Sequence, residues 1–246
     1  KSTLIAADIL DRLGLPWTLF VVVDTLLDGY QPSFARVVEA ASATGTVVRA
    51  GGTEFDLSTN AGKYLFDRRA KSIFANAASE DRDTLTSELL ASPGVEEPSR
   101  AAFPFMTLEE VKELHGRGVE IGNHSARHAN LTRCTEAELE LEVSDSRLRL
   151  ERALGAPVRF FSYPDGRHNR AVRKEVAGSH DVAVATWKAL RPYAPLSLRR
   201  IQAPPTSKEL PRVLVPTSPR RFWWERQKWD LRRRKTELRS RYQRSS

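Results

Sequence analysis

The chain has 246 residues, of which 40% are hydrophobic, enough for one large domain or two small ones. No apolar run approaches the roughly 18 residues of a membrane helix, and the single cysteine, Cys134, excludes an internal disulfide and a cysteine-rich zinc site. Eleven basic and three acidic residues lie in 219–246, and their difference equals the net charge of +8 of the whole chain, so the remainder is neutral.

The start of the chain carries helix and strand signals. Residues 2–13 predict a helix, because their apolar side chains recur on one face and Gly14 suits the position after a helix end. The following run WTLFVVV, residues 17–23, is continuously apolar and β-branched, which is typical of a parallel strand covered on both faces. Residues 33–43 predict the next helix.

A segment with weaker patterns follows, over residues 44–104. Residues 44–55 indicate a strand and a turn, and residues 60–78 and 79–92 indicate two helices, the second opened by Ser79. We therefore interpret this region as a helical insertion.

Helix starts are clearer in the second half of the chain. Thr107 with Glu110, and Thr135 with Glu138, have the spacing of capping boxes, in which each side chain satisfies an amide at the helix start. A short helix is expected at 170–177.

Short strands alternate with these helices. The apolar runs at 119–123, 158–164 and 181–187 predict strands, and residues 198–204 indicate a last short one. Strand and helix alternating at this spacing predict an α/β fold with parallel strands. In such folds the functional loops follow the C-terminal ends of the strands.

Two histidines follow one of these strand ends. His124 and His128 are four residues apart in IGNHSARHANL, and neutral imidazoles at this spacing can share a zinc or related ion if the backbone between them turns. By spacing alone, a chance pair of loop histidines is an equal alternative. A metalloenzyme would also need a further ligand, usually a carboxylate, and an open position for water.

The neighbouring residues resemble those of the polysaccharide deacetylase family, the NodB-homology domain of carbohydrate esterase family 4. GVEIGNHSARHANLT resembles its second motif, H-[ST]-x-x-H, and LGAPVRFFSYPDG resembles its third motif in the subgroup F-S-Y-P-[YF]-G. LDRLGLPWTLFVV is similar to the segment L-x-x-x-G-I-P-A-T-F-F-V. The resemblance covers about residues 1–215.

The resemblance implies a distorted (β/α) barrel and a metal-dependent reaction. His124 and His128 would hold a divalent metal, commonly zinc, together with an aspartate. The metal would polarise an N-acetyl carbonyl and activate water, with a second aspartate as the general base and a late histidine as the general acid. The products would be a free amine and acetate.

The resemblance also implies a loop that stabilises the oxyanion. This loop would be Tyr163, Pro164 and Asp165, through a backbone N–H. Arg200 is a candidate for contact with substrate oxygen rather than for acid catalysis.

The sequence departs from the family pattern in its first motif, T-F-D-D-G. That motif carries the base and the metal aspartate and would lie upstream of Lys1, so we expect the chain to be truncated there. The acidic residues Asp24 and Asp28 follow a different strand, and we interpret their segment as a loop.

Other departures concern the third and last motifs. Asp165 stands where the family has Tyr or Phe, which leaves a backbone amide intact; we interpret it as a turn-capping carboxylate rather than a metal ligand. Gln202 stands where the last motif has its histidine, so acid catalysis would need water or another residue. His168 and His180 are interpreted as surface residues, with His168 the one that could line the cleft.

The proposed organisation is a deacetylase-like barrel over 1–215 and a basic amphipathic tail over 216–246. The tail, chiefly 219–246, fits attachment to an anionic membrane surface or polymer, or equally a helix that packs on the barrel with its arginines in water. Nucleic acid is the weaker partner, because no nucleic-acid-binding motif accompanies the charge.

The main functional hypothesis is a metal-dependent de-N-acetylase of a polysaccharide or other glycan, in cell-envelope or exopolysaccharide metabolism. The alternative is an inactive deacetylase-like barrel that binds glycan or acts as a scaffold. A third possibility is a different amide or ester hydrolase on the same fold. We expect the cell envelope or a membrane surface rather than the cytoplasm, although a chain that starts at Lys1 gives no information on a signal peptide.

Overall fold

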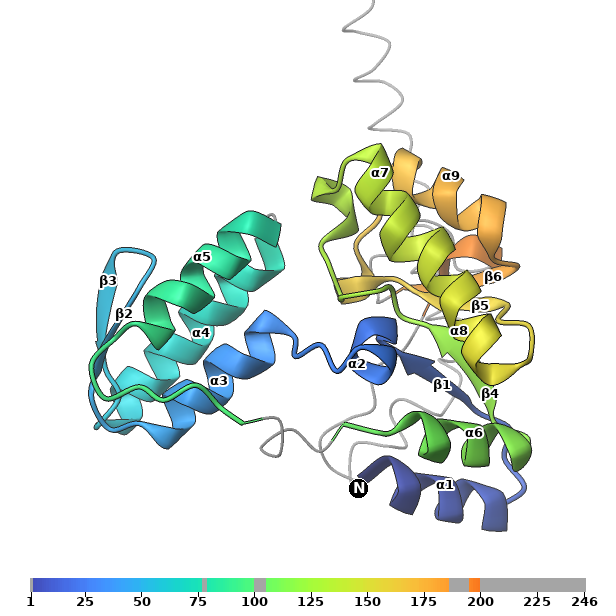
Figure 1. Ribbon diagram of the computed structural model, residues 1–246, viewed down its shortest axis with the longest axis horizontal. Helices are drawn as coiled ribbons and strands as arrows, with labels where there is room; N and C mark the ends of the chain where they lie inside the picture. The colour runs from blue at the N-terminus through green and yellow to red at the C-terminus, as the bar shows by residue number, and fades with distance from the viewer. Residues whose placement is uncertain (1, 77–78, 100–104, 186–194, 200–246) are drawn as a thin grey trace, which may run out of the picture. The chain divides into compact units, whose positions relative to one another are not determined.

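The structure is a computed structural model that describes residues 2–76, 79–99, 105–185 and 195–199 (Figure 1). These residues belong to one compact unit, Lys1–Arg200. The predictions for Arg200, for Gln202 and for the basic tail lie outside the described residues.

The described part of the chain contains a five-stranded sheet with the order β1-β4-β5-β6-β7. Every neighbouring pair is parallel, which confirms the predicted α/β class with parallel strands. The strands are β1 (Thr18–Val21), β4 (Glu120–Asn123), β5 (Phe160–Ser162), β6 (Val182–Ala185) and β7 (Leu198–Arg199). Their C-terminal ends therefore lie along one edge of the sheet, as the sequence predicts for a functional edge.

Helices pack on this sheet in two apolar clusters. At the β1–β4 end, the core joins α1, α6 and α8, with Val111, Ile121 and Leu150 fully or almost fully buried. At the β5–β6 end, the core joins α7, the segment Glu140–Asp145 that follows it, and α9 around Phe161 and Val176. The helices are α1 (Ser2–Arg12), α2 (Val23–Leu27), α6 (Leu108–Gly116), α7 (Glu136–Leu139), α8 (Ser146–Leu154) and α9 (Arg170–Ser179).

Both predicted capping boxes are present. The Thr107 hydroxyl accepts from the Glu110 amide at 3.2 Å, and the Glu110 carboxylate accepts from the Thr107 amide at 2.8 Å. Thr135 and Glu138 are related in the same way at the start of α7. These are local signals, and each fixes its helix start to the residue.

The helix that starts at α7 is not regular throughout. Residues Glu140–Asp145 form a π-helical segment between α7 and α8, and the amide of Ser146 bonds to Val143 rather than to Glu142. A π-turn widens the helix by one residue and leaves main-chain carbonyls for other donors. The sequence did not indicate this interruption.

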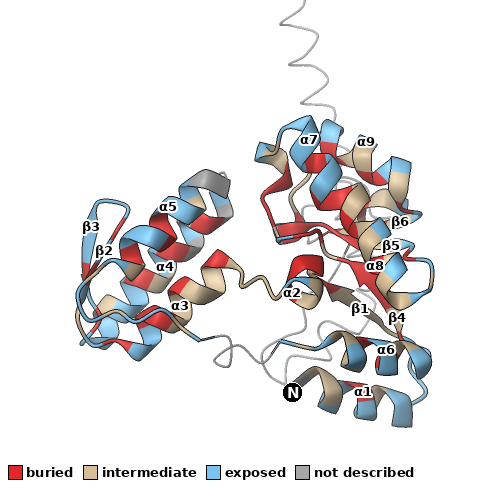
Figure 2. Cartoon of the chain, in the orientation of Figure 1, coloured by how far each residue is buried: buried red, intermediate tan, exposed pale blue. Residues whose placement is uncertain are grey.

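The region interpreted as an insertion contains a hairpin as well as helices. It comprises β2 (Val47–Ala50) and β3 (Thr53–Asp56), which pair antiparallel, with α4 (Asn60–Asn76) and α5 (Ser79–Leu90). Its apolar core also includes α3 (Ser33–Ala43), through Val37 and Ala40. Figure 2 shows the buried residues of these helices facing one another. These elements therefore share a core of their own.

Among the described helices, none combines the length and the apolar character that crossing a bilayer requires.

Candidate functional site

The loop that follows β4 carries both predicted histidines. Backbone hydrogen bonds fasten it to the end of β1: the amide of His124 donates to Val21 at 2.8 Å, and the carbonyl of Ser125 accepts from Val23 at 3.1 Å. His124 and His128 are each half-buried. The loop thus sits at the C-terminal edge of the sheet, where the sequence places it.

The two imidazole rings lie against each other. Their centroids are 4.8 Å apart and their planes are nearly perpendicular, at 88°. Nδ1 of His124 lies 2.7 Å from the carbonyl oxygen of Ser162, the last residue of β5. A carbonyl can only accept, so Nδ1 carries the proton and Nε2 becomes the lone-pair nitrogen. This is the arrangement usual for a histidine that binds a metal through Nε2.

The loop bends sharply between the histidines. Ser125 and His128 both have positive φ, 68° and 59°, which non-glycine residues adopt only when the surroundings hold them there. The Ser125 hydroxyl, fully buried, accepts from the amide of His128 at 2.9 Å. The serine of H-S-x-x-H therefore closes the turn that brings the rings of two residues four apart next to each other.

The predicted oxyanion loop follows β5. The amide of Tyr163 donates to Val184 at 3.1 Å and Pro164 has no N–H, so an oxyanion role among the three residues would fall to the backbone N–H of Asp165. Asp165 is exposed and has φ 53°. Aspartate tolerates this left-handed conformation better than Tyr or Phe does.

Tyr163 is a packed residue rather than a titrating one. Its side chain is buried, and its hydroxyl donates to the carbonyl of Leu196 at 2.9 Å. Burial raises the pKa of Tyr163 to about 12, so the phenol is neutral at physiological pH. Tyr163 therefore shapes the loop and holds it to the segment before β7.

The interpretation of His168 and His180 as surface residues is wrong. His168 is half-buried and stacks on Tyr163 with ring centroids 4.6 Å apart; burial lowers its pKa. His180 is 4% exposed, and burial lowers its pKa to about 3, with the charge of Arg147 adding to the effect. Its position at a helix end hid the fact that it turns inward against Phe161.

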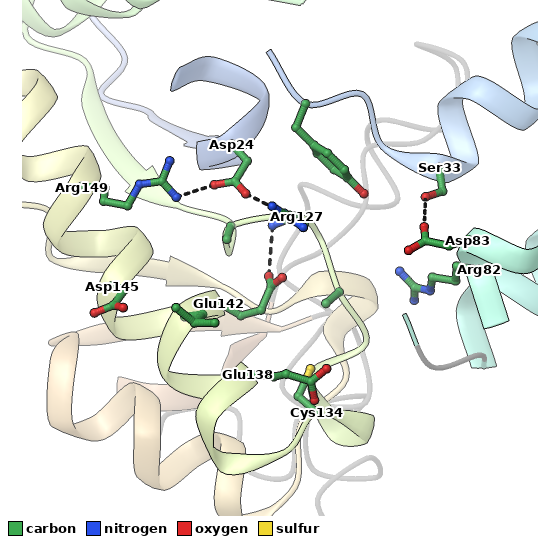
Figure 3. A pocket seen from close by; sticks show the side chains of 14 residues that line it. Asp24, Ser33, Arg82, Asp83, Arg127, Cys134, Glu138, Glu142, Asp145 and Arg149 are labelled. Atoms are coloured by element: carbon green, nitrogen blue, oxygen red, sulfur yellow. Dashed lines mark hydrogen bonds and ion pairs between the residues drawn. The ribbon is translucent and has the colours of Figure 1, made fainter. Parts of the chain in front are cut away.

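Asp24 does not lie in a loop, as the sequence interpretation had it, but in the short helix α2. Its carboxylate is buried and forms ion pairs with Arg127 and Arg149, each at 2.7 Å. Figure 3 marks both ion pairs with dashed lines. Arg149 also forms an ion pair with Asp28. Both oxygens of Asp24 are thus held by guanidinium groups. Because the strongest competitors for a carboxylate already occupy it, Asp24 is poorly placed to replace a metal-binding aspartate.

A buried carboxylate beside the loop, that of Glu142, was not predicted from the sequence. It is 8% exposed and accepts from the amide of Arg127 at 3.0 Å, a bond that Figure 3 marks with a dashed line. Burial raises the pKa of Glu142, while the Arg127 amide and the Ser125 hydroxyl lower it. A signal existed: Glu142 lies between Leu139 and Val143 on the apolar face of its helix, where a charged residue needs a partner.

A pocket of about 340 Å³ borders Glu142 and the Asp24–Arg127 pair. Charged side chains dominate its lining, as Figure 3 shows. A pocket of this composition suits a polar ligand rather than an apolar one.

The histidine pair has two nitrogen atoms that could bind a metal. Within the residues that the structure describes, no cluster of three or more histidine, cysteine, aspartate or glutamate side chains could hold an ion. The donors present fit zinc in chemistry, and the fixed tautomer of His124 fits it further, but they make half of a four-coordinate site.

The parallel sheet with helices packed on it makes this an α/β protein, and its candidate site is the imidazole pair that follows β4. The chain belongs to the polysaccharide deacetylase family, whose model matches residues 2–185. The fold is accordingly of the (β/α) barrel type found in these deacetylases, and the described strands form an open part of its wall.

Solved structures of similar proteins include the following three. A polysaccharide deacetylase from Bacillus cereus is 26% identical over 39% of this chain and 32% of its own, with a TM-score of 0.36. A family pseudoenzyme from Bacillus anthracis is 27% identical over 29% of this chain and 25% of its own, with a TM-score of 0.28. A deacetylase domain from Bordetella bronchiseptica is 15% identical over 79% of this chain and 64% of its own, with a TM-score of 0.44.

The aligned part of this chain thus spans about a third of the Bacillus cereus deacetylase. A comparison with curated proteins gives no match.

Proposed function

We propose that this protein is a metal-dependent hydrolase that removes N-acetyl groups from a polysaccharide or other glycan. The observation that supports it is the pair His124 and His128, with the proton of His124 fixed on Nδ1 by the Ser162 carbonyl. A histidine whose Nδ1 proton is held by a carbonyl keeps the Nε2 lone pair for a ligand, and a second imidazole lies beside it.

In this proposal the chain's own residues bind and orient. His124 and His128 hold the divalent ion, which we propose is zinc and which, when bound, polarises the N-acetyl carbonyl and makes water a better nucleophile. The backbone N–H of Asp165 would face the developing oxyanion. Tyr163 holds that loop to the chain before β7 through its hydroxyl. Arg200, outside the described residues, is proposed to contact substrate oxygen.

A third metal ligand and a general base are also required for this reaction. The described residues offer no third ligand, and Asp24 is held between two arginines. We therefore expect the 246-residue chain by itself to release little or no acetate. Robust turnover by this chain would show that the base and the third ligand lie within it.

A second candidate is an inactive barrel that binds glycan or acts as a scaffold. Asp165 in place of an aromatic residue and Gln202 in place of a histidine favour it. In either case we propose an N-acetylated glycan as the ligand and the cell envelope as the location. The 219–246 tail is proposed to bind an anionic membrane surface or polymer.

The test compares His128→Ala with wild type, using oligomers of N-acetylglucosamine as substrate. The DNA upstream of Lys1 is read first, and any in-frame residues are included in the expressed protein. Zinc binding is measured by titration calorimetry and turnover by acetate release. His115→Ala is the matched control, because His115 lies at the end of α6.

Loss of both bound zinc and acetate release in His128→Ala, with His115→Ala unchanged, supports the hydrolase. Oligomer binding without turnover in wild type, undiminished by His128→Ala, supports the binding protein instead. Acetate release from small esters or amides but not from the oligomers would point to a different hydrolase on this fold.

A further inference from the structure

The loop Ser125–Ala129 has a conformation that its own sequence does not favour. Ser125 and His128 have φ of 68° and 59°, in the left-handed region that is unfavourable for residues other than glycine. The Ser125–His128 hydrogen bond is local and closes one turn. Contacts from outside the loop must therefore hold it in place.

Glu142 provides several of these contacts, beside those from the amides of Val23 and Asp24 and from the guanidinium of Arg82. Its carboxylate accepts from the amide of Arg127 at 3.0 Å, and its main-chain carbonyl accepts from the amide of Ala126 at 3.1 Å. The Ser125 hydroxyl and the Ala129 amide also act on the carboxylate, because both lower its pKa. One residue thus bonds two amides of a five-residue loop and has two further donors near its carboxylate. A carboxylate has about four lone-pair sites, and no neutral side chain of this size accepts as many donors.

The π-helical segment makes the carbonyl of Glu142 available. In an α-helix that carbonyl would accept from the amide of Ser146, but here that amide bonds to Val143. The Glu142 carbonyl instead accepts from Ala126, with the Ser146 hydroxyl at 2.7 Å. The irregular turn therefore converts a helix carbonyl into an acceptor for the histidine loop.

The same segment also holds the strand end that precedes the loop. The side-chain amide of Asn123, fully buried, donates to the carbonyl of Val143 at 3.1 Å and to the Ser146 hydroxyl at 2.9 Å. Asn123 is the residue before His124. The helix thus bonds to Asn123 directly before His124 and to the amide of Ala126 after it.

We propose that Glu142 is a positioning residue that holds His124 and His128 in the paired geometry, with the π-helical segment as its support. Without Glu142, we expect the two imidazoles to lose their relative orientation. The further expectation that zinc affinity then falls rests on the proposed metal function. Glu142 itself has hydrogen bonds to the loop and none of its atoms is assigned to the ion.

A purely structural role would have a different signature. If Glu142 merely fills a polar place in the core, its loss lowers global stability and affects the loop no more than any core defect does. If it positions the loop, its loss affects Ser125–Ala129 out of proportion to stability. The experiment therefore needs a variant of matched stability.

The test uses Glu142→Gln in the whole chain. Glutamine keeps the size but turns an NH₂ group towards N–H donors, so at least one of the loop bonds is lost. Two readouts are taken: amide hydrogen exchange of residues 125–129 without metal, and zinc affinity by competition with a chelating dye. Glu140→Gln is the control, because Glu140 is exposed in the same segment. Leu150→Ala supplies the matched loss of stability from the core.

We expect exchange at 125–129 at least about tenfold faster in Glu142→Gln than in Leu150→Ala, and zinc affinity lower by roughly 10–100-fold, the usual effect of losing an outer-shell partner. Glu140→Gln should match wild type in both. Exchange in Glu142→Gln no faster than in Leu150→Ala would overturn the inference.

The two proposals can fail separately. If wild type binds no zinc but exchange in the loop still accelerates in Glu142→Gln, the positioning role stands and the metal function falls. If wild type binds zinc and Glu142→Gln changes neither affinity nor exchange, the metal function stands and the positioning role falls.

Discussion

His124 donates its Nδ1 proton to the carbonyl of Ser162 across 2.7 Å, and this bond ties the loop after β4 to the end of β5. The two segments are 38 residues apart in sequence and are those that resemble the second and third motifs of the family. The contact sets the tautomer of one imidazole and ties it to the end of β5, where the predicted oxyanion loop begins. A substitution that shifts either segment should therefore alter the position of the other.

His124→Gln should abolish zinc binding. Glutamine removes both the Nδ1 donor and the lone pair at Nε2, so the loss should exceed the roughly 10–100-fold typical of outer-shell changes. Titration calorimetry of the variant against His115→Gln checks this. Zinc affinity within threefold of wild type in His124→Gln would show that the ion binds elsewhere.

Asp24→Asn should lower stability without lowering zinc affinity. The substitution removes the charge between Arg127 and Arg149, but both arginines retain access to solvent, so we expect a loss of about 1–3 kcal/mol in the free energy of unfolding. Urea unfolding measures it, with half-exposed Asp28→Asn expected to cost less than about 1 kcal/mol. A zinc affinity that collapses in Asp24→Asn would make Asp24 a ligand after all.

Stability should fall between pH 6.5 and about pH 3 in part because of His180. Its pKa is lowered from 6.5 to about 3 by burial, so in this range the unfolded chain binds a proton that the folded chain does not. The contribution is fully present above pH 6.5 and is lost as the pH falls, with a slope of up to about 1.4 kcal/mol per pH unit. Arg147 is the charged group whose field acts in the same direction.

The measurement is urea unfolding of wild type and His180→Asn across this range. The difference between the two slopes isolates His180 from the carboxylates, which titrate in both proteins. Equal slopes would mean that His180 is accessible to protons in the folded state.

Asp165→Val should be less stable than Asp165→Gly by about 1–2 kcal/mol, because φ at this position is 53° and both variants lose the same carboxylate. If the backbone N–H is the functional group, Asp165→Gly should leave acetate release by the active protein within a few-fold of wild type. Chemical unfolding and acetate release test the two statements. A large loss of turnover in Asp165→Gly would assign the function to the carboxylate.

The sequence predicted those parts of the fold that rest on local signals. The run at 17–23, the short strand before His124 and the two capping boxes each contain their own evidence, because apolar runs and cap residues act over a few positions. The closeness of His124 to the loop of Asp165 followed from parallel strands sharing one edge.

The parts that were missed depend on partners far along the chain. The carbonyls of Glu142 and Val143, in the π-helical segment, accept hydrogen bonds from Ala126 and Asn123. These two donors lie at the end of β4 and in the loop after it, well before the segment in sequence. The buried position of His180 depends on its contacts with Phe161 and Asn123. The ion pairing of Asp24 depends in part on Arg149. No periodicity in one segment encodes such distant pairings.

The elements from α3 to α5 bury their apolar surface among themselves, around Phe55, Phe66 and Leu89. None of these core residues belongs to the clusters beneath the histidine loop. Substitutions at these core positions should therefore loosen this segment before they disturb the packing beneath the histidine loop. Arg82 of α5 links the two, because its guanidinium donates to the carbonyl of His128 at 3.0 Å.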